Sequence, residues 1–170
     1  SLEATLRADV FYLASDALAG RDEGSAGGLA AQAYIVERFK KCGIRPLGAE
    51  YTQPIDGLPG AANLLGFIPG SDPALRDRYL ILSAHHDHIG VCGPDGEICT
   101  GADDNAAAVA LVLSVGCALA SAPKPPARSV LIATWDAEEP PTFLTSRMGS
   151  RAFVEHPPIP LASIDLALVL

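Results

Sequence analysis

Apolar residues recur along the chain at two different spacings, which predict helices in some segments and strands in others. Helical spacing starts at Leu2, Leu6, Val10 and Leu13, which would share one face of a helix. The same spacing predicts further helices over about 26–42, 105–121 and 146–155. Short apolar runs predict strands over 63–68, 79–84, 129–135 and 164–170. Strands and helices therefore alternate through most of the chain.

This alternation predicts parallel neighbours in a sheet that helices cover on both faces. We expect an α/β fold, a three-layer αβα sandwich around a mixed, mainly parallel sheet. The short link between strands 63–68 and 79–84 predicts that these two pair antiparallel. The length of 170 residues fits one domain. The final run, 164–170, has the composition of an interior strand, so we expect a sheet truncated at its C-terminal side. Residues 1–170 would then form the N-terminal part of a single domain.

Charge and hydropathy exclude two classes of partner. The formal net charge of −8 argues against binding to nucleic acid or to an anionic membrane. The longest apolar stretch, Ala106 to Ala120, is too short and too rich in alanine for a membrane span. We therefore expect neither nucleic acid nor a membrane span.

Three polar clusters occupy corresponding places in this pattern. His85-His86-Asp87-His88 follows strand 79–84, and Glu138-Glu139 follows strand 129–135. Asp103-Asp104-Asn105 stands at the start of helix 105–121. Ligands of open α/β sheets bind at the carboxyl ends of the strands, and His, Asp and Glu are the residues that bind hydrolytic zinc. The clusters predict a metal site at this edge of the sheet.

Each cluster also has an ordinary interpretation: surface histidines, helix caps, or a solvated acidic loop. His85 and Asp87 are two residues apart, so an extended backbone points both to one side, where Asp87 could hold the second ring nitrogen of His85. His86 and His88 would face the other way and support the structure or the site. Of the Glu pair, one carboxylate could bind metal while the other accepts a proton from water.

The aspartates at the helix start are more acidic than a cap requires. The functional interpretation is that Asp103 bridges two metal ions, while Asp104 or Asn105 caps the helix. The three clusters together are hard to explain by capping and solvation alone.

The chain resembles zinc-dependent aminopeptidases of the bacterial leucyl aminopeptidase type, whose relatives include glutamate carboxypeptidase II and glutaminyl cyclases. The resemblance rests on Ala84–Gly90, Gly101–Asn105 and Ala137–Glu139, and extends to Leu13–Arg21 and to Gly149–Phe153. One departure is the longer link 140–148 after the Glu pair.

The resemblance implies two zinc ions, with His85 on one, Asp103 on both and Glu139 on the other. It implies Glu138 as general base, Asp87 as the residue that orients His85, and a cis peptide between Asp103 and Asp104. The family's remaining ligands would lie beyond Leu170. We therefore expect that a missing C-terminal segment completes the site, and that residues 1–170 alone bind zinc weakly and are inactive.

The function expected from the resemblance is that of an aminopeptidase, an exopeptidase that hydrolyses N-terminal residues of a peptide substrate. One alternative is a non-catalytic interaction domain of the same fold, and another is a single-zinc acyltransferase of the glutaminyl cyclase kind.

The four cysteines bear on the compartment. Cys42 and Cys117 lie in predicted helices and are expected to be buried small apolar residues. Cys92 and Cys99 flank a Gly-Pro-Asp-Gly turn, and could form a disulfide or remain free thiols. We expect an exported protein, periplasmic or extracellular, in which such a disulfide could form.

Overall fold

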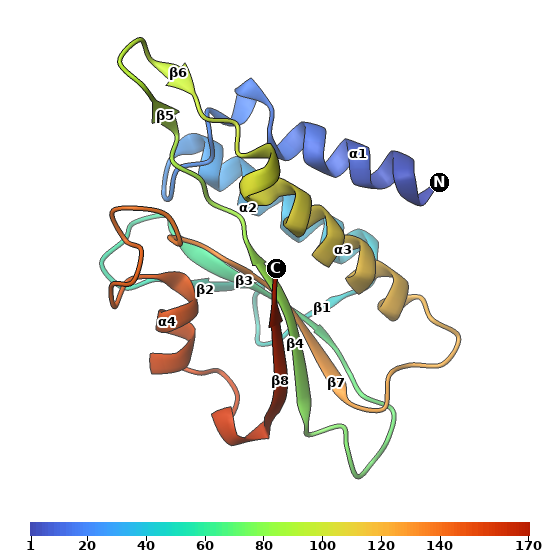
Figure 1. Cartoon of the computed structure of the whole chain (residues 1–170). Coiled ribbons are helices and arrows are strands. Elements are labelled where there is room, and N and C mark those ends of the chain that lie inside the picture. Colours follow the sequence, from blue (N-terminus) through green and yellow to red (C-terminus); the bar gives the residue numbers. More distant parts are fainter.

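A mixed sheet lies at the centre of the molecule, with α1, α2 and α3 on one face and α4 on the other (Figure 1). The computed structural model describes residues 1–170. The helices are α1 (Leu2–Leu13), α2 (Ala26–Lys41), α3 (Ala107–Ala120) and α4 (Gly149–Glu155), with short turns η1 (Asp16–Leu18), η2 (Ala102–Ala106) and η3 (Leu161–Ser163). The predicted αβα fold with a mixed sheet is confirmed.

The sheet has the strand order β1-β3-β7-β4-β8, and β2 also pairs with β3. Its strands are β1 (Arg45–Pro46), β2 (Thr52–Pro54), β3 (Ala62–Ile68), β4 (Tyr79–His85), β7 (Ser129–Trp135) and β8 (Ile164–Val169). Strands β7, β4 and β8 run parallel, whereas β3 runs antiparallel to β7. A separate hairpin, β5 (Val91–Cys92) and β6 (Glu97–Ile98), projects from the sheet.

The predicted antiparallel pairing of β3 with β4 is wrong, because β7 lies between them. After β4, the crossover through α3 brings the chain back as β7. This strand lies beside β4 and separates β4 from β3. The loop after β3 crosses to the start of β7: Gly70 N donates to Ser129 Oγ at 2.9 Å, and Ser71 N to Pro126 O at 2.9 Å. The link is short in sequence, yet it passes one strand instead of forming a hairpin.

Alternation along the central strands divides the core into two layers. Leu64 and Ile132 face α1, α2 and α3, where they pack with Ile35, Phe39 and Val112. Their sequence neighbours Leu65 and Leu131 face α4 and pack with Trp135 and Phe153. Every residue of β7 is buried. A strand buried on both faces has no solvent side, which explains its continuous apolar run.

The segment Ala102–Ala120 is long and apolar enough to cross a bilayer by length and composition. In the structure, α3 packs against α1, α2, β4 and β7, and Val109, Val112 and Leu113 are fully buried. Its apolar character is therefore explained by its place between the sheet and two other helices.

Strand β8 lies at the edge of the sheet, where its single neighbour is β4. Its apolar composition is that of an interior strand, as the sequence indicated. Leu166 and Leu168 are 50% and 52% exposed because no second strand covers this side of the sheet. The start of β8 is held by Asp165, which accepts hydrogen bonds from Arg78 and from Arg128. These two arginines lower the pKa of Asp165 to about 2.

Both pairs of cysteines form disulfides. Cys92 and Cys99 join across the β5–β6 hairpin, with their Cα atoms 5.6 Å apart. Cys42, at the end of α2, joins Cys117 of α3, with a Cα–Cα distance of 5.0 Å. The expectation that Cys42 and Cys117 are separate apolar residues is wrong, because the packing of α2 on α3 places their Cβ atoms together.

We predict that removing the Cys42–Cys117 bridge strongly lowers stability. The bridge closes a long loop, with a sequence separation of 75 residues, and such a cross-link restricts the unfolded chain. The double substitution Cys42→Ala and Cys117→Ala should lower the free energy of unfolding by about 2–4 kcal/mol. Urea denaturation measures this. Cys92→Ala with Cys99→Ala is the control, because that bridge spans a sequence separation of only 7 and its loss should cost less.

Candidate metal centre

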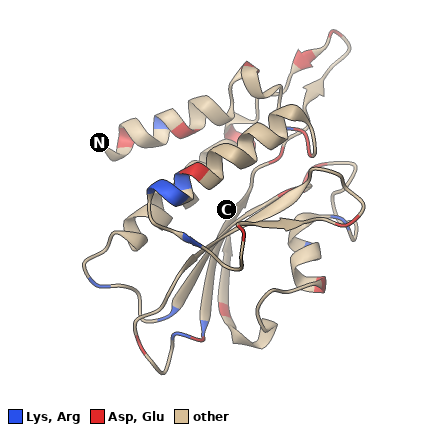
Figure 2. Cartoon of the chain, turned by 180° about the vertical axis from the view of Figure 1, so that it is seen from behind, with Lys and Arg blue, Asp and Glu red and all other residues tan.

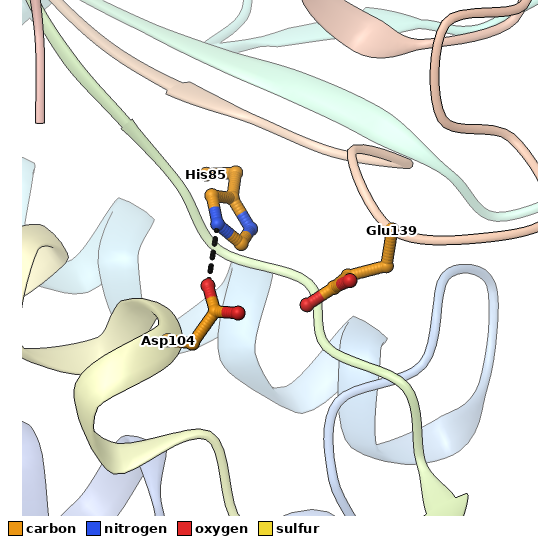
Figure 3. A group of neighbouring side chains, drawn as sticks. All are labelled: His85, Asp104 and Glu139. Carbon is orange, nitrogen blue, oxygen red and sulfur yellow. Dashed lines mark ion pairs between the residues drawn. The ribbon is translucent and has the colours of Figure 1, made fainter.

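Strands β4 and β7 end side by side, and this sets the position of the site. His86 N donates to Trp135 O at 2.8 Å, just beyond the last paired residues of the two strands. His85 is the last residue of β4, and the loop after Trp135 carries Glu138 and Glu139. The turn η2, which leads into α3, faces both strand ends. Figure 3 shows His85, Asp104 and Glu139 pointing toward one another from these three segments.

The distances within this group are short. His85 Nε2 lies 3.0 Å from Asp104 Oδ1 and 3.7 Å from Glu138 Oε2. One potential ligand atom from each of His85, Asp104 and Glu139 lies within 4.8 Å of the other two. The three predicted clusters therefore converge at the carboxyl edge of the sheet.

The aspartate that faces His85 is Asp104, whereas the sequence comparison favoured Asp103. Asp103 is exposed and forms no ion pair with the site. The backbone explains the difference: Asp104 and Asn105 leave helical geometry, at φ −117° and −133°, and this directs Asp104 toward the strand end. The cis peptide is likewise Asp104–Asn105, one bond later than expected. Neither Asp104 nor Asn105 caps α3, because no backbone N–H of its first turn donates a hydrogen bond to a capping side chain.

Asp87 lies behind the site, fully buried, and holds the Glu pair. Its Oδ2 accepts hydrogen bonds from Glu138 N at 2.8 Å and from Glu139 N at 3.1 Å. Its Oδ1 lies 3.5 Å from His85 Nδ1, on the side predicted for it. Asp87 therefore fixes the loop that carries two carboxylates as well as facing the imidazole, and the first of these roles was not visible in the sequence.

The other two histidines of the cluster contact the acidic loop. His88 Nδ1 lies 2.7 Å from Glu139 Oε1, so His88 orients that carboxylate. His86 is buried, and its Nε2 lies 3.6 Å from Asp136 Oδ2. Asp136 in turn accepts hydrogen bonds from Ala62 N and Gln32 Nε2, which anchors the start of the loop to β3 and α2. The sequence gave no signal for Asp136 beyond its place next to Trp135.

Burial and neighbouring charges shift the pKa values of the site residues. Burial raises the pKa of Glu138, and the negative charges of Asp87, Glu139 and Asp104 add to this shift, while His85 opposes it. Burial by itself lowers the pKa of His85, but the carboxylates of Asp87, Glu138 and Asp104 reverse the shift, so the net pKa is raised. A half-buried carboxylate with a raised pKa is suited to take up and release a proton.

The donor set fits zinc on structural grounds. Three carboxylates face one imidazole in a half-buried space, and at neutral pH their mutual repulsion is relieved by a cation. His85 Nδ1 is buried without a hydrogen bond, while Nε2 points into the group. Imidazole nitrogen and carboxylate oxygen are the ligands that hydrolytic zinc takes. His85, Asp104 and Glu139 would hold the ion, and Glu138 would remain beside it.

Glu23 lies close to the site and titrates in an unusual range. Burial, followed by the hydrogen bond and the charge of Asp22, raises the pKa of Glu23 to about 7. The folded state therefore binds this proton more tightly than the unfolded chain, whose pKa is near 4.5. The protonated Glu23 therefore contributes its full share to the free energy of unfolding when the pH is below the unfolded pKa of 4.5. This contribution is lost as the pH rises through about 7.

We predict that Glu23→Gln raises the melting temperature at pH 8 relative to the parent protein, with a smaller gain at pH 5. Glutamine cannot ionise, so the variant does not lose stability at this position when the pH rises. Thermal melts at a series of pH values measure it, and exposed Glu50→Gln controls for the change in net charge. A gain that is the same at both pH values would contradict the assignment to Glu23.

The sequence model of Peptidase family M28 matches residues 63–170, which is more than half of the chain. The chain belongs to peptidase family M28. This confirms the family that the motifs indicated. The M28 match begins at Asn63 in β3 and includes every residue of the metal centre. Comparison with curated protein sequences gave no match.

Solved structures share the fold of this M28 chain at low identity. A Zn-dependent exopeptidase from Parabacteroides distasonis is 21% identical, with a TM-score of 0.72, and the match covers 99% of this chain and 60% of that one. A leucine aminopeptidase precursor from Bacteroides thetaiotaomicron is 16% identical, with a TM-score of 0.74 and coverage of 99% and 61%. A Porphyromonas gingivalis glutaminyl cyclase is 18% identical, with a TM-score of 0.76 and coverage of 99% and 58%. The chain thus spans about three fifths of the length of these structures.

The link after the Glu pair, residues 140–148, forms one wall of a cavity. Phe143 and Met148 of this link line a mostly apolar cavity of about 470 Å³ together with Trp135 and Phe153. His85 and Glu138 lie at its border. The link therefore shapes the space next to the metal centre.

Proposed function

We propose that the protein is a zinc-dependent exopeptidase, and most specifically an aminopeptidase that removes N-terminal residues from peptides. The observation that carries this proposal is the convergence of His85, Asp104 and Glu139 within 4.8 Å, with Glu138 beside them. Membership of family M28 supports a metallopeptidase. The Zn-dependent exopeptidase and the leucine aminopeptidase precursor of the same fold support the choice of zinc and of the N-terminal bond.

The chemistry divides between the ion and the chain. Zinc in such a site polarises the scissile carbonyl and lowers the pKa of water. Glu138 is the proposed general base: its carboxylate accepts a proton from the attacking water and donates it to the leaving amine. Asp87 holds Glu138 and Glu139 through their backbone N–H groups, so both side chains stay free. The carboxylate of Glu138 is then available for proton transfer, and that of Glu139 for binding the metal ion.

We further propose two zinc ions per complete site, with Asp104 shared between them. A carboxylate has two oxygens, each of which can bind a metal ion. Asp104 has a ligand atom within 4.8 Å of those of both His85 and Glu139, so its carboxylate could serve ions held by either residue. His85 would then serve one ion and Glu139 the other, as the family resemblance implies.

A second candidate is a single-zinc acyltransferase of the glutaminyl cyclase kind. The structural similarity to a Porphyromonas gingivalis glutaminyl cyclase, with a TM-score of 0.76, favours this candidate. Both reactions use a metal-polarised carbonyl and a carboxylate that moves a proton. They differ in the nucleophile, which is water in hydrolysis and the substrate's own N-terminal amine in cyclisation.

The test is to purify the intact protein, measure its zinc content and assay two substrate types. If the protein is an aminopeptidase, it should release the chromophore from aminoacyl substrates that carry a chromogenic leaving group, and it should hold two zinc ions. A glutaminyl cyclase converts N-terminal glutamine to pyroglutamate and holds one. A folded protein that binds no zinc and processes neither substrate would support the non-catalytic interaction domain instead.

We also propose that the protein is exported to the periplasm or the exterior. Two disulfides join all four cysteines, and such bonds persist in oxidising compartments. The location is checked by fractionating cells and blotting for the protein.

A further inference from the structure

Arg21 is a fully buried cation that makes no ion pair. It lies between η1 and α2 and is 1% exposed. Its guanidinium group donates to backbone carbonyls only: Nε to His86 O at 3.0 Å, Nη1 to Thr100 O at 2.7 Å and to Leu13 O, and Nη2 to Gly101 O at 3.0 Å. A buried charge is costly unless its donors are satisfied, and here four carbonyls satisfy them.

These carbonyls belong to the segments that carry the metal centre. His86 directly follows His85, and Thr100 and Gly101 lead directly into the turn of Asp104. Leu13 ends α1 and connects both segments to the helix layer. The planar fork of an arginine fixes the relative positions of its acceptors. Arg21 therefore joins the strand end with His85 to the turn with Asp104 through its own side chain.

Backbone contacts make this junction tight. Arg21 O accepts from His88 N at 3.3 Å, and Gly20 O accepts from Gly90 N at 3.2 Å. Gly101 has φ +56°, and a Cβ atom there would lie 2.3 Å from Asp104 O and 2.6 Å from Arg21 Nη2. Residue 101 thus has no room for a side chain between the turn that presents Asp104 and the guanidinium group of Arg21.

The charge of Arg21 complements the acidic site. Burial lowers its pKa, while the charges of Asp87, Asp104 and Glu139 act in the opposite direction. The carboxylates that oppose the loss of its proton are therefore those of the metal centre. Lys40, Lys41 and Arg38, by contrast, gather at the last turn of α2 and supply no such contact (Figure 2).

We propose that Arg21 is a positioning residue that sets the spacing between His85 and Asp104 and thereby the zinc affinity of the site. The inference rests on the proposed zinc-dependent function. Arg21 forms no hydrogen bond with the metal-ligand side chains, and acts through the backbone carbonyls of Leu13, His86, Thr100 and Gly101.

The test compares Arg21→Lys with Arg38→Lys in the intact protein. Lysine keeps the charge at residue 21 but cannot bridge four carbonyls. Loss of such a supporting contact typically weakens metal binding by about 10–100-fold, and we expect the zinc Kd to rise by that factor in a competition titration with a chromophoric chelator. Arg38 of α2 pairs with buried Asp9 of α1: its Nη2 donates to Asp9 Oδ2 at 3.1 Å. Arg38→Lys should lower the melting temperature of the metal-free protein without changing the zinc Kd.

The visible spectrum of the Co²⁺-loaded protein supplies a second readout. A changed arrangement of His85 and Asp104 alters the spectrum in Arg21→Lys, whereas a loss of stability alone does not. If Arg21→Lys does not fold, Gly101→Ala disturbs the same contact from the opposite side, and its zinc Kd should rise as well.

The outcomes separate this inference from the proposed function. A folded Arg21→Lys or Gly101→Ala protein with the parent's zinc Kd and Co²⁺ spectrum overturns the role of Arg21. If the variants bind zinc more weakly than the parent protein, but the parent turns over no substrate, the positioning role of Arg21 is supported and the proposed activity is overturned. A parent protein that binds no zinc overturns both.

Discussion

Glu138→Gln in the intact protein is expected to lower kcat by roughly 10²–10⁴-fold, the usual contribution of general acid–base catalysis, with zinc content unchanged. The amide retains the size of the side chain but cannot accept a proton. Glu138 lies beside the donor set, 3.7 Å from His85 Nε2, and its backbone position is held by Asp87 independently of its side chain. Steady-state kinetics and metal analysis of the same preparation measure both quantities.

Glu139→Gln is the matched control for this prediction. It makes the same chemical change one residue later, where the carboxylate faces His85 and Asp104 and contacts His88 at 2.7 Å. We expect this variant to lose zinc as well as activity. Equal loss of zinc in the two variants would show that the base and the ligand have been assigned to the wrong residues.

Asp104→Asn is expected to weaken zinc binding by more than the 10–100-fold typical of a residue that only supports a ligand, while Asp103→Asn leaves it unchanged. Asp104 Oδ1 lies 3.0 Å from His85 Nε2, whereas Asp103 forms no ion pair with the centre. The two aspartates are adjacent and exposed, and both substitutions remove one negative charge. A difference between them therefore reports the position of the carboxylate and excludes a general effect of charge.

Zinc Kd values from chelator competition measure this pair. The reverse result, with weak binding in Asp103→Asn alone, would restore the assignment that the motif favoured. Equal and small changes in zinc Kd in the two variants would mean that neither aspartate binds zinc, and would remove the basis for an aspartate shared between two ions.

The local pattern determined which segments of the chain form the site. The apolar runs of β4 and β7 are followed at once by His85 and by Glu138-Glu139, and parallel strands end at one edge of a sheet. Two facts of sequence, the strand period and the residues that follow each strand, were therefore enough to expect these side chains together. Family resemblance added the expected chemistry without needing the fold.

Tertiary structure decided the choices that sequence left equivalent. Asp103 and Asp104 are identical side chains one residue apart, and only the non-helical backbone of the turn directs Asp104 to His85. The neighbour of β3 depended on where the α3 crossover returned the chain, which a short link does not encode. Cys42 met Cys117 because α2 packs on α3.

Arg21 shows the same division most clearly. In the sequence it is one arginine in a glycine-containing loop, 65 residues from His86 and 80 from Gly101. Its proposed role depends on four backbone carbonyl groups. Every residue carries such a group, so no residue pattern reveals them. Side-chain chemistry near strand ends can be predicted from sequence because it is local, whereas backbone acceptors gathered from distant segments exist only once the chain has folded.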